Sequence, residues 1–109
     1  MTLLVALLGV GAAGAQSVEK GNELFASGQF DEAATTFETL TEADASNGPA
    51  WYGLARSWHE GGHAEKAVSA YERALGLNES LGRTLYHFAR LHASNGARAK
   101  AIALLELSL

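Results

Sequence analysis

The spacing of small and large apolar residues repeats along this chain with a period of 34 residues. A shift of that length aligns one column of glycines, two columns of small residues and one column of large apolar residues. The aligned sets are Gly28, Gly62 and Gly96; Ala33, Ala67 and Ala101; Gly21, Ala55 and Ala89; and Phe37, Tyr71 and Leu105. Such a period is typical of stacked units, because each unit buries its apolar face only against its neighbours.

Each unit contains two stretches of helical pattern with the glycine between them. Glycine adopts a left-handed backbone without strain, so we expect it to reverse the chain between two antiparallel helices. The large column, Phe37, Tyr71 and Leu105, is expected to fill the space between successive hairpins. The pattern predicts helices over about residues 17–27, 30–43, 49–60, 64–76, 82–94 and 97–109. The corresponding repeats span about residues 16–47, 48–81 and 82–109.

Local signals and composition agree with this pattern. Pro49 falls in the first turn of its predicted helix, where its missing N–H costs nothing. Asn78 and Ser80 mark a break before the third unit. β-branched residues are few, and the chain has a single proline, which suits packed helices better than strands. We therefore predict an all-α protein with one domain, residues 16–109.

Residues 1–15 have the pattern of a signal peptide. An uncharged apolar run at residues 3–10 is followed by small residues that form a cleavage site ending at Ala15. The run is shorter than the about 20 residues that span a bilayer, so no stable membrane anchor is expected after cleavage. A buried N-terminal helix is the alternative, because no Lys or Arg precedes the run. The protein is thus expected to be exported, to the periplasm or outside the cell.

Charge and residue usage exclude several classes of function. The net charge of −4 argues against nucleic acid as a partner, which requires a basic surface to displace counterions from phosphates. Absence of cysteine removes disulfides, thiolate catalysis and cysteine-based zinc sites. No nucleophile paired with a base and no phosphate-binding glycine loop is present, so the chain is not expected to be an enzyme or to hold a cofactor.

The middle unit carries a family resemblance. Its apolar and small positions resemble the tetratricopeptide repeat pattern at Trp51, Leu54, Ala55, Gly62, Ala67, Tyr71 and Ala74. The other two units are similar but depart from that pattern at Ser17 and Lys20 in the first and at His92 and Ser108 in the third. The resemblance implies three antiparallel helix-turn-helix repeats stacked as a short right-handed α-solenoid.

The resemblance also implies a binding surface, because the first helix of each such hairpin lines a concave groove that holds extended peptides or partner helices. The positions carried over to this chain as the peptide-binding groove are Asn22, Tyr52, Arg56, His59, Arg83, Tyr86 and Arg90. Arginine binds carboxylates through paired hydrogen bonds and stacks on aromatic rings, so an acidic peptide or a C-terminal carboxylate is the expected ligand. The alternative is that these arginines are solvated charges paired with neighbouring glutamates.

One string in the sequence matches a zinc-protease motif, His59-Glu60-Gly61-Gly62-His63. A working site of that kind places both histidines on one unbroken helix, one turn apart. Here Gly62 is in register with the other turn glycines, so the string is expected to straddle a turn and no metal site is predicted. His92 is expected to replace a core apolar residue, and His87 is expected to lie at the surface.

The last predicted helix has no polar capping helix after it. Repeat arrays normally end in such a cap, because the terminal unit otherwise exposes the face meant for its next neighbour. Ile102, Leu105 and Leu109 are therefore expected to form a docking or oligomer surface. The main function predicted is a peptide-binding scaffold. The alternative is a structural N-terminal module of a larger envelope protein, or a self-associating assembly, that docks through this end; a further C-terminal stretch of chain is one way to cover it.

Overall fold

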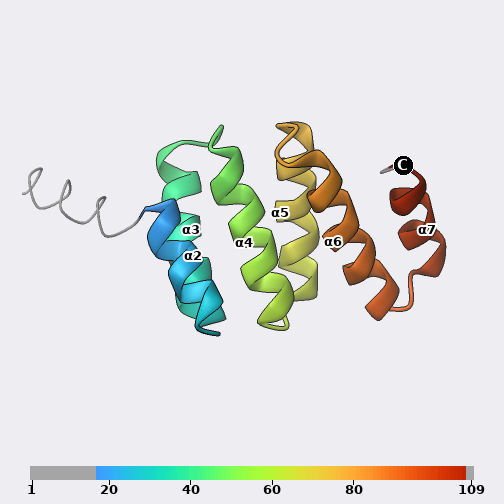
Figure 1. Ribbon diagram of the computed structural model, residues 1–109, viewed down its shortest axis with the longest axis horizontal. Coiled ribbons are helices and arrows are strands. Elements are labelled where there is room, and N and C mark those ends of the chain that lie inside the picture. Colours follow the sequence, from blue (N-terminus) through green and yellow to red (C-terminus); the bar gives the residue numbers. More distant parts are fainter. Residues whose placement is uncertain (1–16, 108–109) are drawn as a thin grey trace, which may run out of the picture.

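The computed structural model describes residues 17–107, and this part of the chain consists of three helical hairpins side by side (Figure 1). The hairpins pair α2 with α3, α4 with α5 and α6 with α7. The helices are α2 (Val18–Ala26), α3 (Phe30–Ala43), α4 (Gly48–Glu60), α5 (Ala64–Gly76), α6 (Leu81–Ser94) and α7 (Arg98–Leu107). The predicted all-α class is confirmed for these residues. The signal peptide of residues 1–15 and the surface residue Leu109 lie outside them and stay predictions.

The three aligned glycines form the hairpin turns, as predicted. Gly28, Gly62 and Gly96 have φ values of +82°, +88° and +81°. Around the first turn, the Gly28 N–H donates to the Phe25 carbonyl and the Gln29 N–H to the Leu24 carbonyl, both at 2.9 Å. These bonds satisfy carbonyls that the helix end leaves without a partner. A side chain at any of the three glycines would be strained by the left-handed backbone.

Polar side chains set the starts of two helices. The Ser17 hydroxyl accepts a hydrogen bond of 3.0 Å from the Lys20 N–H at the start of α2. The Asn47 side chain accepts one of 3.1 Å from the Ala50 N–H at the start of α4, next to Pro49. Each bond satisfies an amide that has no partner inside its helix, and Pro49 has no amide hydrogen to leave unsatisfied.

The break between the second and third hairpins takes a different form. Asn78 and Ser80 both adopt left-handed conformations, with φ values of +57° and +41°. The Thr84 hydroxyl donates a 2.7 Å hydrogen bond to the Glu79 carbonyl and so ties the turn to α6. This junction therefore turns through two residues in left-handed conformations.

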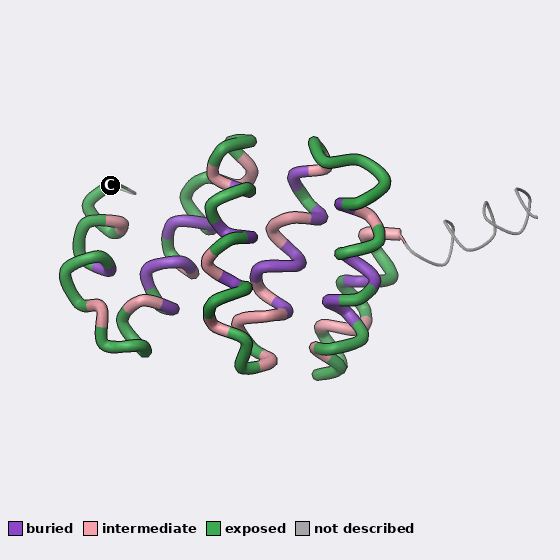
Figure 2. The backbone as a smooth tube through the Cα atoms, turned by 180° about the vertical axis from the view of Figure 1, so that it is seen from behind, coloured by how far each residue is buried: buried purple, intermediate pink, exposed green. Residues whose placement is uncertain are grey.

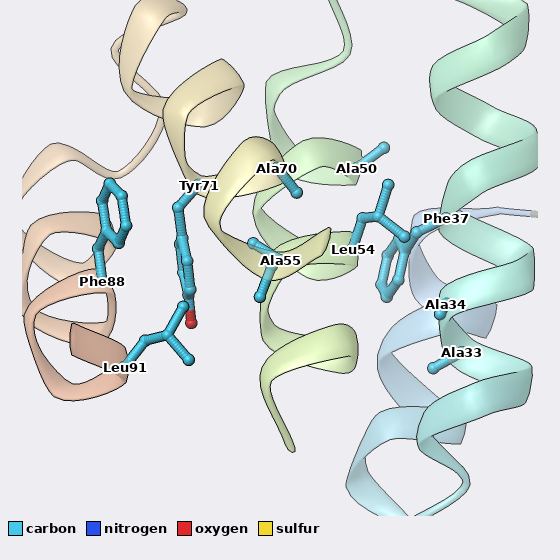
Figure 3. Packing of buried hydrophobic residues seen from close by; sticks show 11 residues of the cluster. Ala33, Ala34, Phe37, Ala50, Leu54, Ala55, Ala70, Tyr71, Phe88 and Leu91 are labelled. Carbon is cyan, nitrogen blue, oxygen red and sulfur yellow. The ribbon is translucent and has the colours of Figure 1, made fainter. Parts of the chain in front are cut away.

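Small residues face large rings throughout the core (Figure 3). The Phe37 side chain is fully buried between α2 and α4. A Cβ atom built at Gly21 would lie 2.5 Å from the Phe37 ring, and one built at Gly53 would lie 2.4 Å from it. Tyr71 is also fully buried, and its ring stacks on Phe88 with centres 5.2 Å apart. A fully buried aromatic ring thus lies at each junction, Phe37 between the first two hairpins and Tyr71 between the second and third.

The large apolar column behaves differently in its last member. Leu105 was expected to fill an inter-hairpin space like Phe37 and Tyr71, but it is 41% exposed. The reason is that no further hairpin follows α7 within the described residues. Figure 2 shows the same contrast, since buried backbone is common in the inner helices and sparse in α7, where Ala101 is the one buried residue. The structure contains no helix, among the residues described, that is long and apolar enough to cross a membrane.

Candidate functional site

The first helices of the three hairpins carry one connected set of rings and guanidinium groups. The Arg56 guanidinium on α4 lies 4.8 Å from the centre of the Phe25 ring on α2. The Arg83 guanidinium on α6 lies 5.3 Å from the centre of the Tyr52 ring on α4. A cation over an aromatic face is attracted by the quadrupole of the ring. These contacts therefore join α2 to α4 and α4 to α6.

The other predicted residues lie on the same helices. Tyr86 is 52% exposed on α6. Asn22 is exposed on α2, and no side-chain hydrogen bond within residues 17–107 joins it to the rest. The structure therefore brings six of the seven predicted residues into one cluster and leaves Asn22 at its edge. We call this surface the basic face; its residues are Asn22, Tyr52, Arg56, His59, Arg83, Tyr86 and Arg90.

The arginines of the basic face have few acidic partners. Arg90 Nη1 lies 3.9 Å from Glu60 Oε2, the one Arg–Glu contact within 4.0 Å in the described chain. Arg56 Nη1 donates to the Tyr52 hydroxyl at 3.4 Å, while the buried Arg56 Nε has no hydrogen-bond partner. Simple pairing with glutamates, the alternative derived from the sequence, thus does not describe Arg56 or Arg83. The face carries an excess of positive charge and of hydrogen-bond donors.

His59 connects the basic face to the core. Its Nδ1 lies 2.8 Å from the hydroxyl of the buried Tyr71 on α5. Burial raises the pKa of Tyr71, so the hydroxyl keeps its proton. Burial also lowers the pKa of His59, the positive charges of Arg90 and Arg56 lower it further, and Glu60 opposes them. These effects favour the neutral form of the His59 ring, which contacts a core side chain.

His87 is the residue of this site that the sequence did not reveal. It is partly exposed, in agreement with the expected surface position, but its ring also lies 6.2 Å from Tyr52 and 5.2 Å from Tyr86, between centres. Its Nδ1 lies 3.1 Å from Arg90 Nη1. Helical spacing offered a signal, because His87 lies three residues before Arg90 and four after Arg83 and so shares their face.

The pKa of His87 predicts how stability depends on pH. Burial and then the charges of Arg56, Arg90 and Arg83 lower this pKa from 6.5 to about 4. Between pH 4 and pH 6.5 the unfolded chain therefore binds more protons at His87 than the folded chain does. The neutral His87 thus contributes stability above pH 6.5, and this contribution is lost as the pH falls towards 4. The expected loss is about 1 kcal/mol, because solvent screens a half-buried group. Chemical denaturation across this pH range should show a larger loss in the wild type than in His87→Asn; equal losses in both would contradict the prediction.

The zinc-protease string straddles a turn, as predicted. Helix α4 ends at Glu60, and Gly62 reverses the chain before α5 begins at Ala64. His59 contacts Tyr71, whereas His63 Nε2 lies 3.3 Å from Asp31 Oδ1 on α3. The two rings thus have different partners on different helices. Within residues 17–107, no three His, Cys, Asp or Glu side chains are grouped so that they could hold a metal ion.

Comparison with known families identifies the repeat. The family model described as tetratricopeptide repeat matches residues 18–82, which is more than half of the chain. The chain belongs to the tetratricopeptide repeat family. The resemblance drawn from the repeat columns is therefore confirmed, and the three hairpins form a short α-solenoid of such repeats. No curated protein matches the sequence significantly.

Solved structures with the same tetratricopeptide fold include secretion chaperones. The type III secretion translocator chaperone SycD of Yersinia enterocolitica matches with a TM-score of 0.79 and 22% identity, over 84% of this chain and 69% of SycD. SycD in complex with a peptide of the translocator YopD matches with a TM-score of 0.79 and 21% identity, over 84% and 70%. PcrH in complex with the chaperone-binding region of PopD matches with a TM-score of 0.68 and 20% identity, over 81% and 84%. Identities this low establish a shared fold only.

Proposed function

We propose that this tetratricopeptide repeat protein is a protein-interaction scaffold that binds an extended acidic segment of a partner polypeptide along the basic face. The observation that carries the proposal is the arrangement of Arg56, Arg83 and Arg90 among aromatic rings, with Glu60 as the one acidic group that contacts them in the described chain. Three guanidinium groups facing one carboxylate favour an anionic ligand that restores the balance of charge.

The chemistry of these side chains suits a peptide. A guanidinium group binds a carboxylate through two parallel hydrogen bonds, and a planar ring beside it can cover an apolar side chain. Tyr86 is exposed and offers both a ring and a hydroxyl to such a ligand. Binding of this kind needs no catalytic step.

The structural neighbours support the class of ligand without identifying it. SycD has been crystallised with a peptide of YopD, and PcrH with the chaperone-binding region of PopD. Both proteins share the fold of this chain and hold a segment of another polypeptide. A polypeptide segment is accordingly the ligand class we assign to the present chain.

A selection experiment tests the proposal. Residues 16–109 are immobilised and used to select from a display library of random linear peptides, beside a triple variant in which Arg56, Arg83 and Arg90 are changed to Glu. A second triple variant, Lys66→Glu, Arg98→Glu and Lys100→Glu, changes the net charge equally but lies on α5 and α7, the second helices of their hairpins. It serves as the matched control.

The wild type and the control are expected to enrich peptides rich in Asp and Glu. Reversal of the three arginines is expected to weaken binding of those peptides at least about a hundredfold, because it replaces paired charges by like charges. Equal binding by the two triple variants would contradict the proposal, since it would show that only net charge matters. Enrichment of uncharged peptides by the wild type would contradict the assignment of an acidic ligand.

Helix α7 supports a second candidate function, self-association. Ile102 is 50% exposed and Leu107 is 72% exposed. An apolar patch of this kind can meet the same patch of a second copy across a two-fold axis. Sedimentation equilibrium is expected to show dimers of the wild type and monomers of Ile102→Glu. A monomeric wild type would exclude this function.

A further inference from the structure

His87 lies in the middle of the basic face and contacts residues of two helices. Its ring lies beside Tyr52 on α4 and beside Tyr86 on its own helix α6. Its Nδ1 is 3.1 Å from Nη1 of Arg90, one turn along α6. The ring is therefore fixed by aromatic neighbours on two sides and by a polar contact at one nitrogen.

The contact with Arg90 determines where the imidazole proton resides. A guanidinium group is always protonated in proteins and has donors only. Arg90 Nη1 must therefore donate, and Nδ1 of His87 must accept. A neutral imidazole with Nδ1 as acceptor carries its proton on Nε2. The bond also disfavours a second proton, because an N–H at Nδ1 would point at the N–H of Arg90.

The charges around His87 act in the same direction. Arg83 and Arg90 approach it from α6, and Arg56 and His59 approach it from α4. Glu60, also on α4, contacts Arg90. No element packed against the ring brings a carboxylate into hydrogen-bond contact with it in the described chain. The surroundings thus oppose the imidazolium form, and burial opposes it further.

The second ring nitrogen of His87 is available to a ligand. Within residues 17–107, no side chain or backbone group forms a hydrogen bond with Nε2. Among the described residues, the one buried side-chain nitrogen or oxygen without a hydrogen-bond partner is Arg56 Nε. Since Nε2 of His87 also has no partner, it is not buried and is in contact with solvent. His87 therefore offers to the basic face a neutral N–H donor whose direction is set by the protein, beside charged donors on longer and more flexible side chains.

We propose that His87 is a specificity-determining residue of the basic face, locked by Arg90 as the Nε2–H tautomer and donating that N–H to an acceptor oxygen of the bound peptide. The bound peptide in this inference rests on the proposed function, whereas the tautomer of His87 does not depend on it. A fixed neutral donor favours a carbonyl or carboxylate oxygen at one place, whereas the arginines attract negative charge without fixing its position as closely.

The tautomer is measured first, on the ligand-free protein. Long-range ¹H–¹⁵N NMR spectra at about pH 6.5 distinguish the protonated ring nitrogen from the other by its chemical shift. His87 is expected as the neutral Nε2–H tautomer in the wild type and as a tautomer mixture in Arg90→Met, which removes the donor. A wild-type ring protonated on Nδ1, or on both nitrogens, would overturn the proposal.

Two variants then test the donor. His87→Asn keeps an acceptor near the position of Nδ1 but has no group at Nε2, whereas His87→Gln can place an amide N–H near Nε2. The probe is a fluorescent hexaglutamate peptide with blocked ends, titrated against each protein by anisotropy. His87→Asn is expected to bind about tenfold more weakly than the wild type, and His87→Gln within about threefold of it. Equal affinity of His87→Asn and the wild type would overturn the proposal.

The two inferences fail in different ways. If hexaglutamate does not bind the wild type, the acidic ligand of the proposed function fails, and the tautomer measurement alone decides the assignment of His87. If the probe binds and is lost in the triple arginine variant but not in His87→Asn, the basic face binds peptides without a donor from His87. Thermal unfolding of both His87 variants verifies that each is folded.

Discussion

Replacement of Phe37 by alanine is expected to lower the free energy of unfolding by about 3–5 kcal/mol. The ring is fully buried and lies against Gly21 of α2 and Gly53 of α4, so it is a large part of the packing between the first two hairpins. Its removal loses the transfer free energy of the ring and leaves a cavity that helices fixed by their own hydrogen bonds cannot fill. Urea denaturation followed by circular dichroism measures the change.

A double-mutant cycle with Gly53→Ala tests the same contact more closely. A Cβ atom at Gly53 would lie 2.4 Å from Phe37, so Gly53→Ala in the wild type is expected to cost about 1–3 kcal/mol. In the Phe37→Ala background the clash is gone, and the better helix propensity of alanine, about 1 kcal/mol, is expected to dominate. Gly82→Ala is the matched control, because a Cβ there meets no atom within 4 Å. A coupling energy below about 0.5 kcal/mol would contradict the assigned contact.

The sequence predicted the fold well because the repeat constrains each column in three places at once. A glycine at position 62 alone says little, but its register with Gly28 and Gly96 indicates a left-handed turn, and all three have positive φ. The same register predicted that the zinc-protease string is broken, because it placed Gly62 between two helices. Repetition therefore supplied the evidence that a single short motif lacks.

The last unit shows that the repeat columns do not predict burial. Leu105 occupies the column of the buried Phe37 and Tyr71 yet is 41% exposed, because burial of that column depends on a following hairpin and not on the residue itself. The absence of a polar capping helix after this unit predicts an exposed apolar surface, and Ile102 is 50% exposed there. A repeat column thus predicts where a residue lies within its hairpin, whereas the adjacent hairpins determine how far that residue is buried.

The candidate site was predictable in its residue types but not in its electrostatics. Family resemblance placed Arg56, Arg83 and Arg90 on one face. In the structure, Arg56 and Arg83 both contact Tyr52, whereas Arg90 contacts His87. The role of His87 could not be derived in this way, because it depends on the distance between its Nδ1 and Arg90 and on rings from two helices. The contact with Tyr52 is set by packing between α4 and α6, which the pattern along one helix does not contain.

Replacement of Tyr71 by alanine is the second change with a large expected effect, a loss of about 3–5 kcal/mol in the free energy of unfolding. Tyr71 is fully buried on α5 and stacks on Phe88 of α6 at 17° between ring planes (Figure 3). Its hydroxyl also contacts His59 of α4. Its removal thus loosens the second hairpin from the third and also releases a residue of the basic face. Urea denaturation measures the loss of stability.

Tyr71→Phe separates the two roles of this residue. It keeps the stacked ring and removes the hydroxyl 2.8 Å from His59 Nδ1, so it is expected to cost only about 1–2 kcal/mol. The His59 ring then loses the partner that orients it, and its NMR signals are expected to shift in Tyr71→Phe while those of Phe88 stay close to their wild-type positions. If Tyr71→Phe were as unstable as Tyr71→Ala, the hydroxyl rather than the ring would hold the hairpins together. If the His59 signals did not move, the basic face would be independent of the core beneath it.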